Sequence, residues 1–314
     1  MINYSDRHID VGLTNFSKRL DNQGFIWPLL LPRVKVKKDS DKYWIYGDEH
    51  FKVPYAKRRD KTESMEVEWS MSNTDYSCQP SAAHVKISKR DRNNADSPIR
   101  LEQDGTQLAR EKVMLSIEKE VADMLVSTSN ITTYSTLGAG GTNLGQWNDP
   151  TSAQNKPLEI IDTAVQSIYD YTLKEANTIV IPWKVWQALK LNADIKELLK
   201  YQYAKQIIEG QAVPMVINGL RVLIARAAYD ATKKKVARTT FTNLWSDTVL
   251  VAYIDPKPGW GSDTLGVSFD SAGPVVRKWH DSNINCDKIE FEEQGLDHVL
   301  TDAYCGYLLV DTLK

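Results

Sequence analysis

SPIRLEQDGTQLAREKVMLSIEKEVADMLVST, residues 97–128, has the pattern of one long amphipathic helix. Serine followed by proline is a frequent helix start, because a serine oxygen can accept from unpaired amides and proline fits the first turn. A second start at Asp104-Gly105-Thr106 leaves open whether the helix is broken there. Apolar residues recur three and four positions apart, and charged residues fill the other face. The apolar face is Leu108, Met114, Leu115, Ile117, Val121, Met124 and Leu125, and the charged face is Arg110, Glu111, Lys112, Glu118, Lys119, Glu120 and Asp123.

The composition bounds the class of protein. The chain has 314 residues, of which 42% are hydrophobic and 25% charged, so it can bury a core, and its length favours two domains. A net charge of −2 argues against an avid nucleic-acid binder. The three cysteines lack CxxC spacing, which favours a reducing compartment. The apolar run FIWPLLLP, residues 25–32, is too short to span a membrane, so we expect a soluble protein made in the cytoplasm.

Residues 1–38 read as an N-terminal arm. Residues 1–24 are polar and have no apolar periodicity, so they offer no core of their own. Pro28 and Pro32 then bracket a short leucine run, which an alternating Arg33-Val34-Lys35-Val36-Lys37 follows. Proline disfavours helix in the residue before it, so this part is predicted to be extended and to lead into a strand.

Residues 39–96 are predicted to form a long β-hairpin with a charged crest, Lys57-Arg58-Arg59-Asp60-Lys61-Thr62-Glu63. Short alternating runs, such as Val67-x-Trp69-x-Met71, give its strands only a thin apolar stripe. Two arms of about 15–20 residues would reach ~50–65 Å at ~3.3 Å per residue. A compact chain of this length has a radius of gyration of about 20 Å. Because an isolated two-stranded ribbon is marginally stable, we expect the hairpin to rest on a neighbouring copy.

The second half of the chain alternates helix and strand. A second amphipathic helix is predicted over residues 157–175, a buried strand over 178–181, a helix from Pro182, and strands over 220–225 and 249–254. This order is typical of a compact α/β domain. After the boundary at Pro256-Lys257-Pro258-Gly259 the chain is β-like again, and we expect it to pack back under the long helix.

No catalytic or metal-binding pattern is evident. The five histidines lack ligand spacing, so no metal and no cofactor is predicted. The loop Gly138–Gly145 is glycine-rich, yet it lacks the Gly-Lys-Ser/Thr ending of a phosphate-binding loop. Glu290, Glu292 and Glu293 sit on or beside an alternating strand, and a solvated strand face explains them better than a glycosidase-like pair. We therefore predict that the chain is not an enzyme.

The ordered set of segments resembles a known family. It comprises the arm, the charged hairpin, RDRNNADSPIRLEQDGTQLAREKVMLSIEKEVADML (90–125), Trp147-Asn148-Asp149-Pro150, the helix 157–175, and NTIVIP (177–182) with VWQALKLNADIKELLKY (185–201). This arrangement, covering residues 25–314, resembles tailed-bacteriophage major capsid proteins of the Hong Kong 97 fold. The resemblance implies an α+β fold with five parts: an arm (1–38), an extended loop (39–96), a peripheral domain with a spine helix (97–176), an inserted axial domain (177–270) and returning peripheral strands (271–314).

The same resemblance implies a function. Copies of the chain would self-assemble as pentamers and hexamers into an icosahedral head shell, a virion structure that encloses double-stranded DNA without reading its sequence and without a membrane. Portal and scaffolding proteins would be partners, with a decoration protein as a further candidate. We predict subunit contacts at Trp27, Pro28, Arg58, Arg59, Lys61 and Trp69.

Three alternatives stay open at this point. One is a cellular compartment of the same fold that holds protein cargo. Another is an enzyme that binds a nucleotide at Gly138–Gly145. The third is a monomeric binding module.

Overall fold

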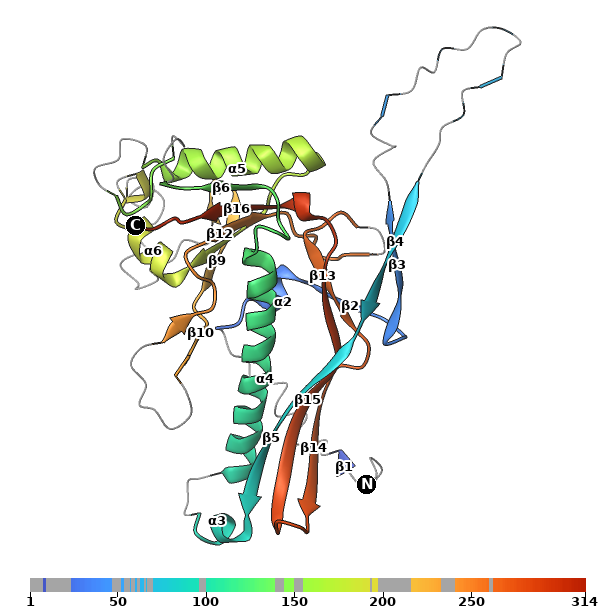
Figure 1. Ribbon diagram of the computed structural model, residues 1–314, viewed down its shortest axis with the longest axis vertical. Helices are drawn as coiled ribbons and strands as arrows, with labels where there is room; N and C mark the ends of the chain where they lie inside the picture. The colour runs from blue at the N-terminus through green and yellow to red at the C-terminus, as the bar shows by residue number, and fades with distance from the viewer. Residues whose placement is uncertain are drawn as a thin grey trace.

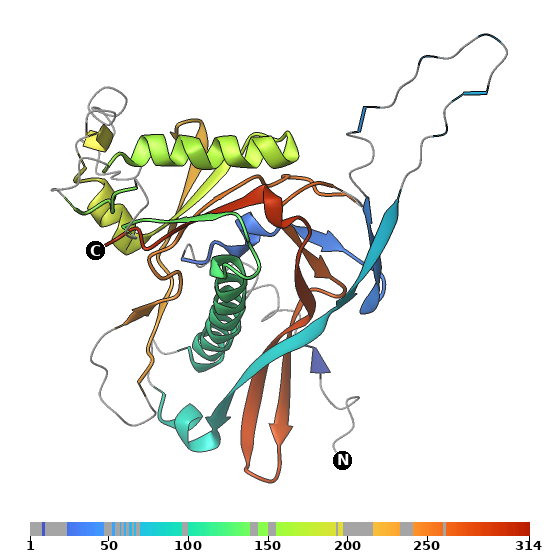
Figure 2. The same cartoon turned by 45° about the horizontal axis from the view of Figure 1, so that its top comes forward.

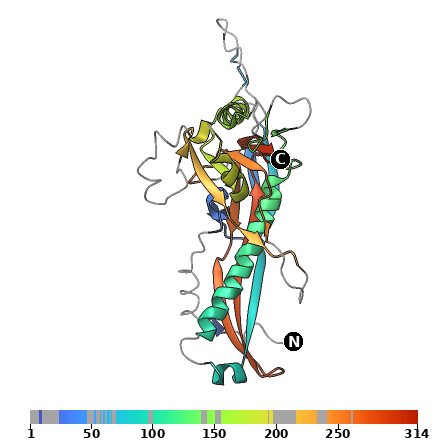
Figure 3. The same ribbon diagram turned by 90° about the vertical axis from the view of Figure 1, so that its left-hand side faces the viewer.

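The computed structural model describes residues 8–9, 24–46, 52–53, 57, 60, 63–64, 66, 70–95, 100–138, 144–149, 155–192, 194–196, 216–232, 241–259 and 262–314. In these residues two six-stranded sheets pack against one long helix, and a two-stranded hairpin extends away from them (Figure 1). The body is long and thin when it is seen edge-on (Figure 3). The described part of the chain contains no helix with the length and hydrophobicity needed to cross a membrane.

The long helix is α4, Leu101–Val126. It runs without a break through Gly105, so the second start considered at Asp104 is not used. Ser97 and Pro98, the predicted start, lie outside the described residues. The apolar stripe is largely confirmed, since Met114, Ile117, Val121 and Leu125 are buried.

Two positions on α4 differ from the amphipathic prediction. Leu108 is 48% exposed, although it was placed on the core side. Glu118 is fully buried, although it was placed on the charged side. The reason is geometric. Position 118 lies on the same face of the helix as Met114, Val121 and Leu125, and other segments cover that face.

The first sheet carries the lower half of the molecule. Its strands are β1 (His8–Ile9), β2 (Arg33–Lys35), β5 (Gln79–Ser88), β13 (Gly266–Asp270), β14 (Pro274–Asp281) and β15 (Cys286–Leu300). The long β15 pairs with β14, β5 and β13, and α4 lies against β15 and β5. Ile289, Phe291 and Leu296 of β15 join α4 in the main core, so the predicted packing of the returning tail under the helix is confirmed.

The second sheet forms the other half. Its strands are β6 (Tyr134–Thr136), β7 (Thr178–Pro182), β8 (Val216–Ile217), β9 (Leu220–Ala225), β12 (Val249–Ala252) and β16 (Gly306–Val310). Helices α5 (Pro157–Thr172) and α6 (Trp183–Leu189) pack on it (Figure 2). All five residues of β7 are buried, as expected for a central strand between paired neighbours.

Short elements connect these layers. They are α2 (Trp27–Leu30), α3 (Lys89–Asn93), β10 (Ala228–Tyr229), β11 (Thr242–Asn243) and the 3-10 turn η3 (Ala303–Cys305). Ser88 caps α3 in a reciprocal capping box with Asp91, which fixes the turn between β5 and the approach to α4.

The described strands of the hairpin make up only part of the predicted segment 39–96. They are β3 (Ser40–Tyr46) and β4 (Met71–Ser77), which pair antiparallel. The next strand, β5, was predicted as part of the hairpin, but it pairs with β15 inside the first sheet. The reason is that Val85 and Ile87 find apolar partners under α4, so this stretch has a core to join.

The two sheets also divide the chain differently from the predicted domains. Strand β13 falls inside the predicted axial segment 177–270, yet it pairs with β15 and β2 of the first sheet. Strand β16 falls inside the predicted returning segment 271–314, yet it pairs with β12 and β6 of the second sheet. Helix α5, predicted in the peripheral domain, packs in the core of the second sheet. The chain therefore crosses between sheets more often than the predicted boundaries imply.

Candidate subunit interface

The hairpin presents two unlike faces. On the inner face, at its base, Tyr43 and Tyr76 are buried and contact Phe269 of β13, with ring centroids 5.5 Å and 4.5 Å away respectively. Burial raises the pKa of both phenols. On the outer face Trp44 is 48% exposed and Met71 is 42% exposed. The hairpin is thus anchored at its base, and it exposes apolar side chains on its other face.

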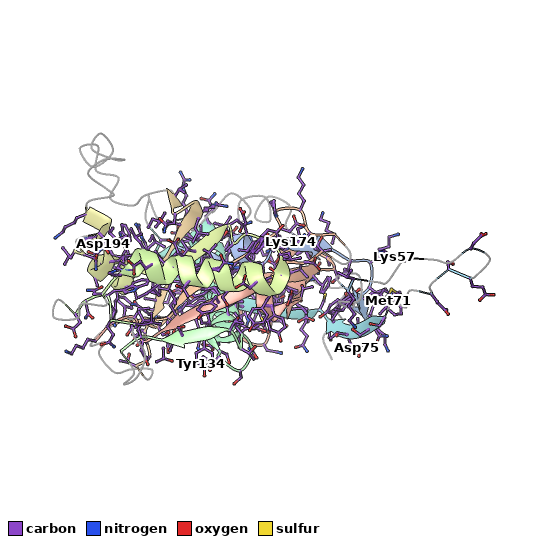
Figure 4. All side chains as sticks on the ribbon, turned by 90° about the horizontal axis from the view of Figure 1, so that it is seen from above. Lys57, Met71, Asp75, Tyr134, Lys174 and Asp194 are labelled. Carbon is purple, nitrogen blue, oxygen red and sulfur yellow. The ribbon has the colours of Figure 1, made fainter. Side chains whose placement is uncertain are left out.

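The outer part of the hairpin carries charge. Lys57, Asp60, Glu63 and Glu66 are exposed, and Lys57 projects well beyond the body when the molecule is viewed from above (Figure 4). Four of the predicted interface residues, Arg58, Arg59, Lys61 and Trp69, lie outside the described residues.

Trp27 and Pro28 begin helix α2, and the structure places them differently from each other. Trp27 is 1% exposed, with Arg33 over its ring and the edge of His298 against it. Its side chain therefore offers almost no surface to a neighbour, in contrast to the predicted contact. Pro28 is exposed and lines a cleft of about 370 Å³ with Leu29, Pro32, Asn177, Thr178, Arg221, Ile254 and Pro256.

Glu118 on α4 is a buried carboxylate that sequence reasoning placed in solvent. Glu118 Oε2 accepts from the backbone N–H groups of Ile26, at 3.1 Å, and Trp27, at 3.0 Å. Its Oε1 accepts from the indole N–H of Trp245, at 2.8 Å. We call these four residues the Glu118 junction. It joins α4, the first turn of α2 and the turn between β11 and β12.

A second group of charges fixes the outer end of the first sheet. The Arg92 guanidinium contacts Glu102 at 3.1 Å and Asp287 at 2.6 Å, and Lys278 also contacts Glu102. The hydrogen bond from His280, followed by that from Arg92, holds the pKa of Asp287 below its ordinary value. These pairs tie α3 and the start of α4 to the tip of the β14–β15 hairpin, so Arg92 has a structural role in its own subunit.

The three glutamates of β15 are paired rather than solvated. Glu290 and Glu292 contact Arg277 on β14. Glu293 lies on the opposite side, 1% exposed, and contacts Arg33 at 2.5 Å. Burial is the main reason why the pKa of Glu293 is raised, and Arg33 opposes that shift. Because an arginine lies beside each of these three carboxylates, we interpret them as ion pairs that stabilise the fold.

Other candidate chemistry gains no support from the described geometry. No group of three metal-ligating side chains converges within the ranges given above. Residues 139–143 of the glycine-rich loop lie outside the described part. Cys78 and Cys305 are buried, and burial raises the pKa of the Cys78 thiol to about 11, so it stays protonated at neutral pH.

An exposed aromatic pair lies at the end of α5. Tyr171, 63% exposed, stacks on Tyr304 of η3 with ring centroids 5.0 Å apart. Leu173, which ends the helix in the left-handed conformation, is 56% exposed beside it. Sequence reasoning did not single out these residues, because each is an isolated apolar position until the fold brings η3 beneath α5.

Comparison with known proteins gives this geometry a context. No family model matches the chain. The chain is 26% identical to the major capsid protein of Burkholderia phage BcepMu, over 96% of its own length and 94% of that protein. A solved phage-related protein from Bordetella bronchiseptica shares the fold with a TM-score of 0.69 and 21% identity, over 98% of both chains. The capsid structure of cyanophage P-SCSP1u matches with a TM-score of 0.65 and 11% identity, over 91% of this chain and 88% of the other.

A non-viral shell shares the fold more distantly. The SrpI encapsulin of Synechococcus elongatus matches with a TM-score of 0.51 and 11% identity, over 95% of this chain and 90% of that one. Together the structural matches show the fold. It is the α+β Hong Kong 97-like fold, as the resemblance predicted.

Proposed function

We infer that this chain is a major capsid protein, the subunit that self-assembles into the head shell of a tailed phage and resides in the virion. The observation that carries this conclusion is the match to the BcepMu major capsid protein, which spans nearly the whole of both chains in sequence. The folds of a phage-related protein and of a cyanophage capsid agree with it, over 98% and 91% of this chain respectively. The encapsulin matches with a TM-score of 0.51, lower than the 0.69 and 0.65 of these two structures, so the cargo compartment is the second candidate.

The hairpin supplies a physical reason for assembly. Its anchoring cluster contains few apolar residues, and Trp44 and Met71 point away from it. Covering the apolar surface of such a ribbon with another surface is favourable, by about 25 cal/mol per Å² of apolar area buried. We therefore propose that the hairpin lies across an adjacent subunit. Repeated around closed rings, such heterologous contacts build pentamers and hexamers, and many modest contacts add up by multivalency.

We further propose that the crest residues Arg58, Arg59 and Lys61 dock on an acidic surface of the neighbour. Replacing all three by Glu should leave the subunit folded and abolish or destabilise shells, measured as particle yield by negative-stain microscopy. Replacing Asp60 and Glu63 by Lys is the matched control, because it changes charge on the same crest with the opposite sign. Undiminished particle yield in the triple variant would remove this role from the crest.

The contents of the shell are also a proposal. A net charge of −2 suits a container for double-stranded DNA, because a strongly basic wall would hold the packaged DNA through counterion release. Portal and scaffolding proteins, and a decoration protein, are proposed partners. The deciding experiment is microscopy of the expressed chain with nuclease treatment of the particles. Nuclease-protected DNA in particles from infected cells supports the phage head, whereas a co-purifying protein cargo would favour the compartment.

A further inference from the structure

We propose that Glu118 is a pH-graded latch: it holds the N-terminal segment 24–31 and the turn around Trp245 on α4, and its hold weakens as the carboxyl ionises. This is a property of the single chain and does not depend on the proposed shell. A negative result here would leave the capsid function untouched.

The geometry of the Glu118 junction makes it a coupling point. Its three donors come from two segments that are more than 200 residues apart in sequence, Ile26 and Trp27 on one side and Trp245 on the other. Each oxygen of the carboxylate serves a different segment. Removing the Glu118 side chain would therefore leave buried N–H groups unpaired on both segments, which is unfavourable.

The Glu118 junction lies next to strands of both sheets, so its opening would affect both parts of the fold. Segment 24–31 is the part of the N-terminal arm that directly precedes strand β2 of the first sheet. Trp245 precedes β12, a central strand of the second sheet. Opening the junction would thus loosen the arm and the second sheet from the same point on α4.

The chemistry of the carboxyl sets the sign of the pH effect. All three partners of Glu118 are neutral N–H groups, so the buried charge has donors but no counter-charge. Burial is the largest effect on Glu118, and it raises the pKa above the ordinary value of 4.5 despite the three donors. In an open arrangement the hydrated carboxyl would return to about that ordinary value. The closed arrangement therefore binds the proton more tightly, and closing weakens as pH rises from 4.5 to the raised pKa.

Of the neighbouring groups, Lys119 and His298 do not reproduce this behaviour, whereas the pKa of Glu120 shifts in the same direction. Within the described part of the chain, the hydrogen-bond partners of Glu118 are the N–H groups of Ile26, Trp27 and Trp245, and none of them is charged. Lys119 pairs with Asp123 at 2.6 Å. Burial lowers the pKa of His298 to about 4, so it stays neutral above pH 5. Glu120 also has a raised pKa, which is why the test must isolate Glu118 by substitution.

The test is hydrogen–deuterium exchange of the full-length chain between pH 5 and 8, corrected for the intrinsic exchange rate at each pH. Peptides covering residues 24–31 and 242–248 report on the two latched segments, and a peptide covering β7 is the internal reference. We expect protection of both segments to fall together as pH rises, by up to tenfold per pH unit within the titration window. In Glu118→Gln the pH dependence should vanish. The same slope in Glu118→Gln, or a wild-type protection that is constant or rises with pH, would overturn the proposal.

A second variant decides the matter if Glu118→Gln does not fold. Trp245→Phe removes one hydrogen bond to the ionised carboxylate and keeps an aromatic ring in place. The pKa of Glu118 in the closed arrangement should then rise further. The fall in protection of residues 24–31 should still begin near pH 4.5 and should continue to a pH about one unit higher, the scale of one charge-assisted hydrogen bond. An unchanged pH profile in Trp245→Phe would refute the latch.

Discussion

The base of the hairpin offers the sharpest test of how the structure supports assembly. Tyr76 is 3% exposed and stacks on Phe269, whereas the other six residues of β4 are exposed. We predict that Tyr76→Ala releases the hairpin from the first sheet and leaves the two large cores intact. The reason is that Tyr76 belongs to a small cluster separate from both of them.

The magnitude follows from burial. A buried aromatic side chain covers about 150–250 Å², which at about 25 cal/mol per Å² corresponds to about 4–6 kcal/mol. Measured substitutions of buried aromatic residues by alanine cost about 3–5 kcal/mol. Docking of the hairpin should therefore weaken by about two to three and a half powers of ten, since each tenfold change is about 1.4 kcal/mol.

Two measurements separate local release from global unfolding. Hydrogen exchange of residues 40–46 and 71–77 should accelerate strongly in Tyr76→Ala, while the thermal midpoint of the body changes little. Particle yield should fall, because fewer subunits hold the hairpin in a competent position. Tyr76→Phe is the matched control: it keeps the stacked ring and loses only a 3.4 Å contact from the hydroxyl to the Lys38 carbonyl. Wild-type exchange of the hairpin in Tyr76→Ala would show that this cluster does not anchor it.

Three further substitutions test the interior. Gly105→Ala should raise the thermal midpoint by about 1–3 °C, because a new Cβ meets only ordinary contacts within an unbroken helix and alanine favours helix by about 0.5–1 kcal/mol; a lower midpoint would contradict this. Gly266→Ala should abolish soluble expression, because its Cβ would lie 2.6 Å from the backbone oxygen of Val299; a normal yield would show that the strand can shift. Arg33→Met should destabilise the chain by up to about 3 kcal/mol in urea unfolding at pH 7, because it leaves Glu293 buried without its cation. The pKa of Glu293 would then rise further, so this loss should shrink at pH 5, and an equal loss at both pH values would exclude the ion pair as its cause.

Periodicity predicted the elements whose burial is decided locally. The strand at 178–181 is a continuous apolar run, and it is fully buried in β7. The strand at 220–225 is reproduced residue for residue in β9. The long helix was predicted within a few residues at the described end, because its apolar residues recur at helical spacing from Leu108 to Leu125, over about five turns.

The same reasoning failed where partners come from distant sequence. Alternating residues in β5 predicted a two-faced strand correctly, but alternation cannot say which strand it pairs with. Glu118 was placed in solvent because it is charged. Glu118 lies four residues after Met114, three before Val121 and seven before Leu125. This helical spacing was the one indication that it faces the core.

The sequence by itself predicted the long helix, the strands at 178–181 and 220–225 and a charged run at 57–63, because these features depend on spacing and composition along the chain. The α+β shell-type fold followed from the resemblance of the ordered set of segments to a known family. Only the tertiary structure decided that Trp27 is buried, that β5 belongs to the body, and that Glu118 joins two distant segments. The physical reason is that burial and hydrogen bonding depend on which groups meet in space. A carboxylate among neutral N–H donors is therefore invisible until the fold brings those donors to it.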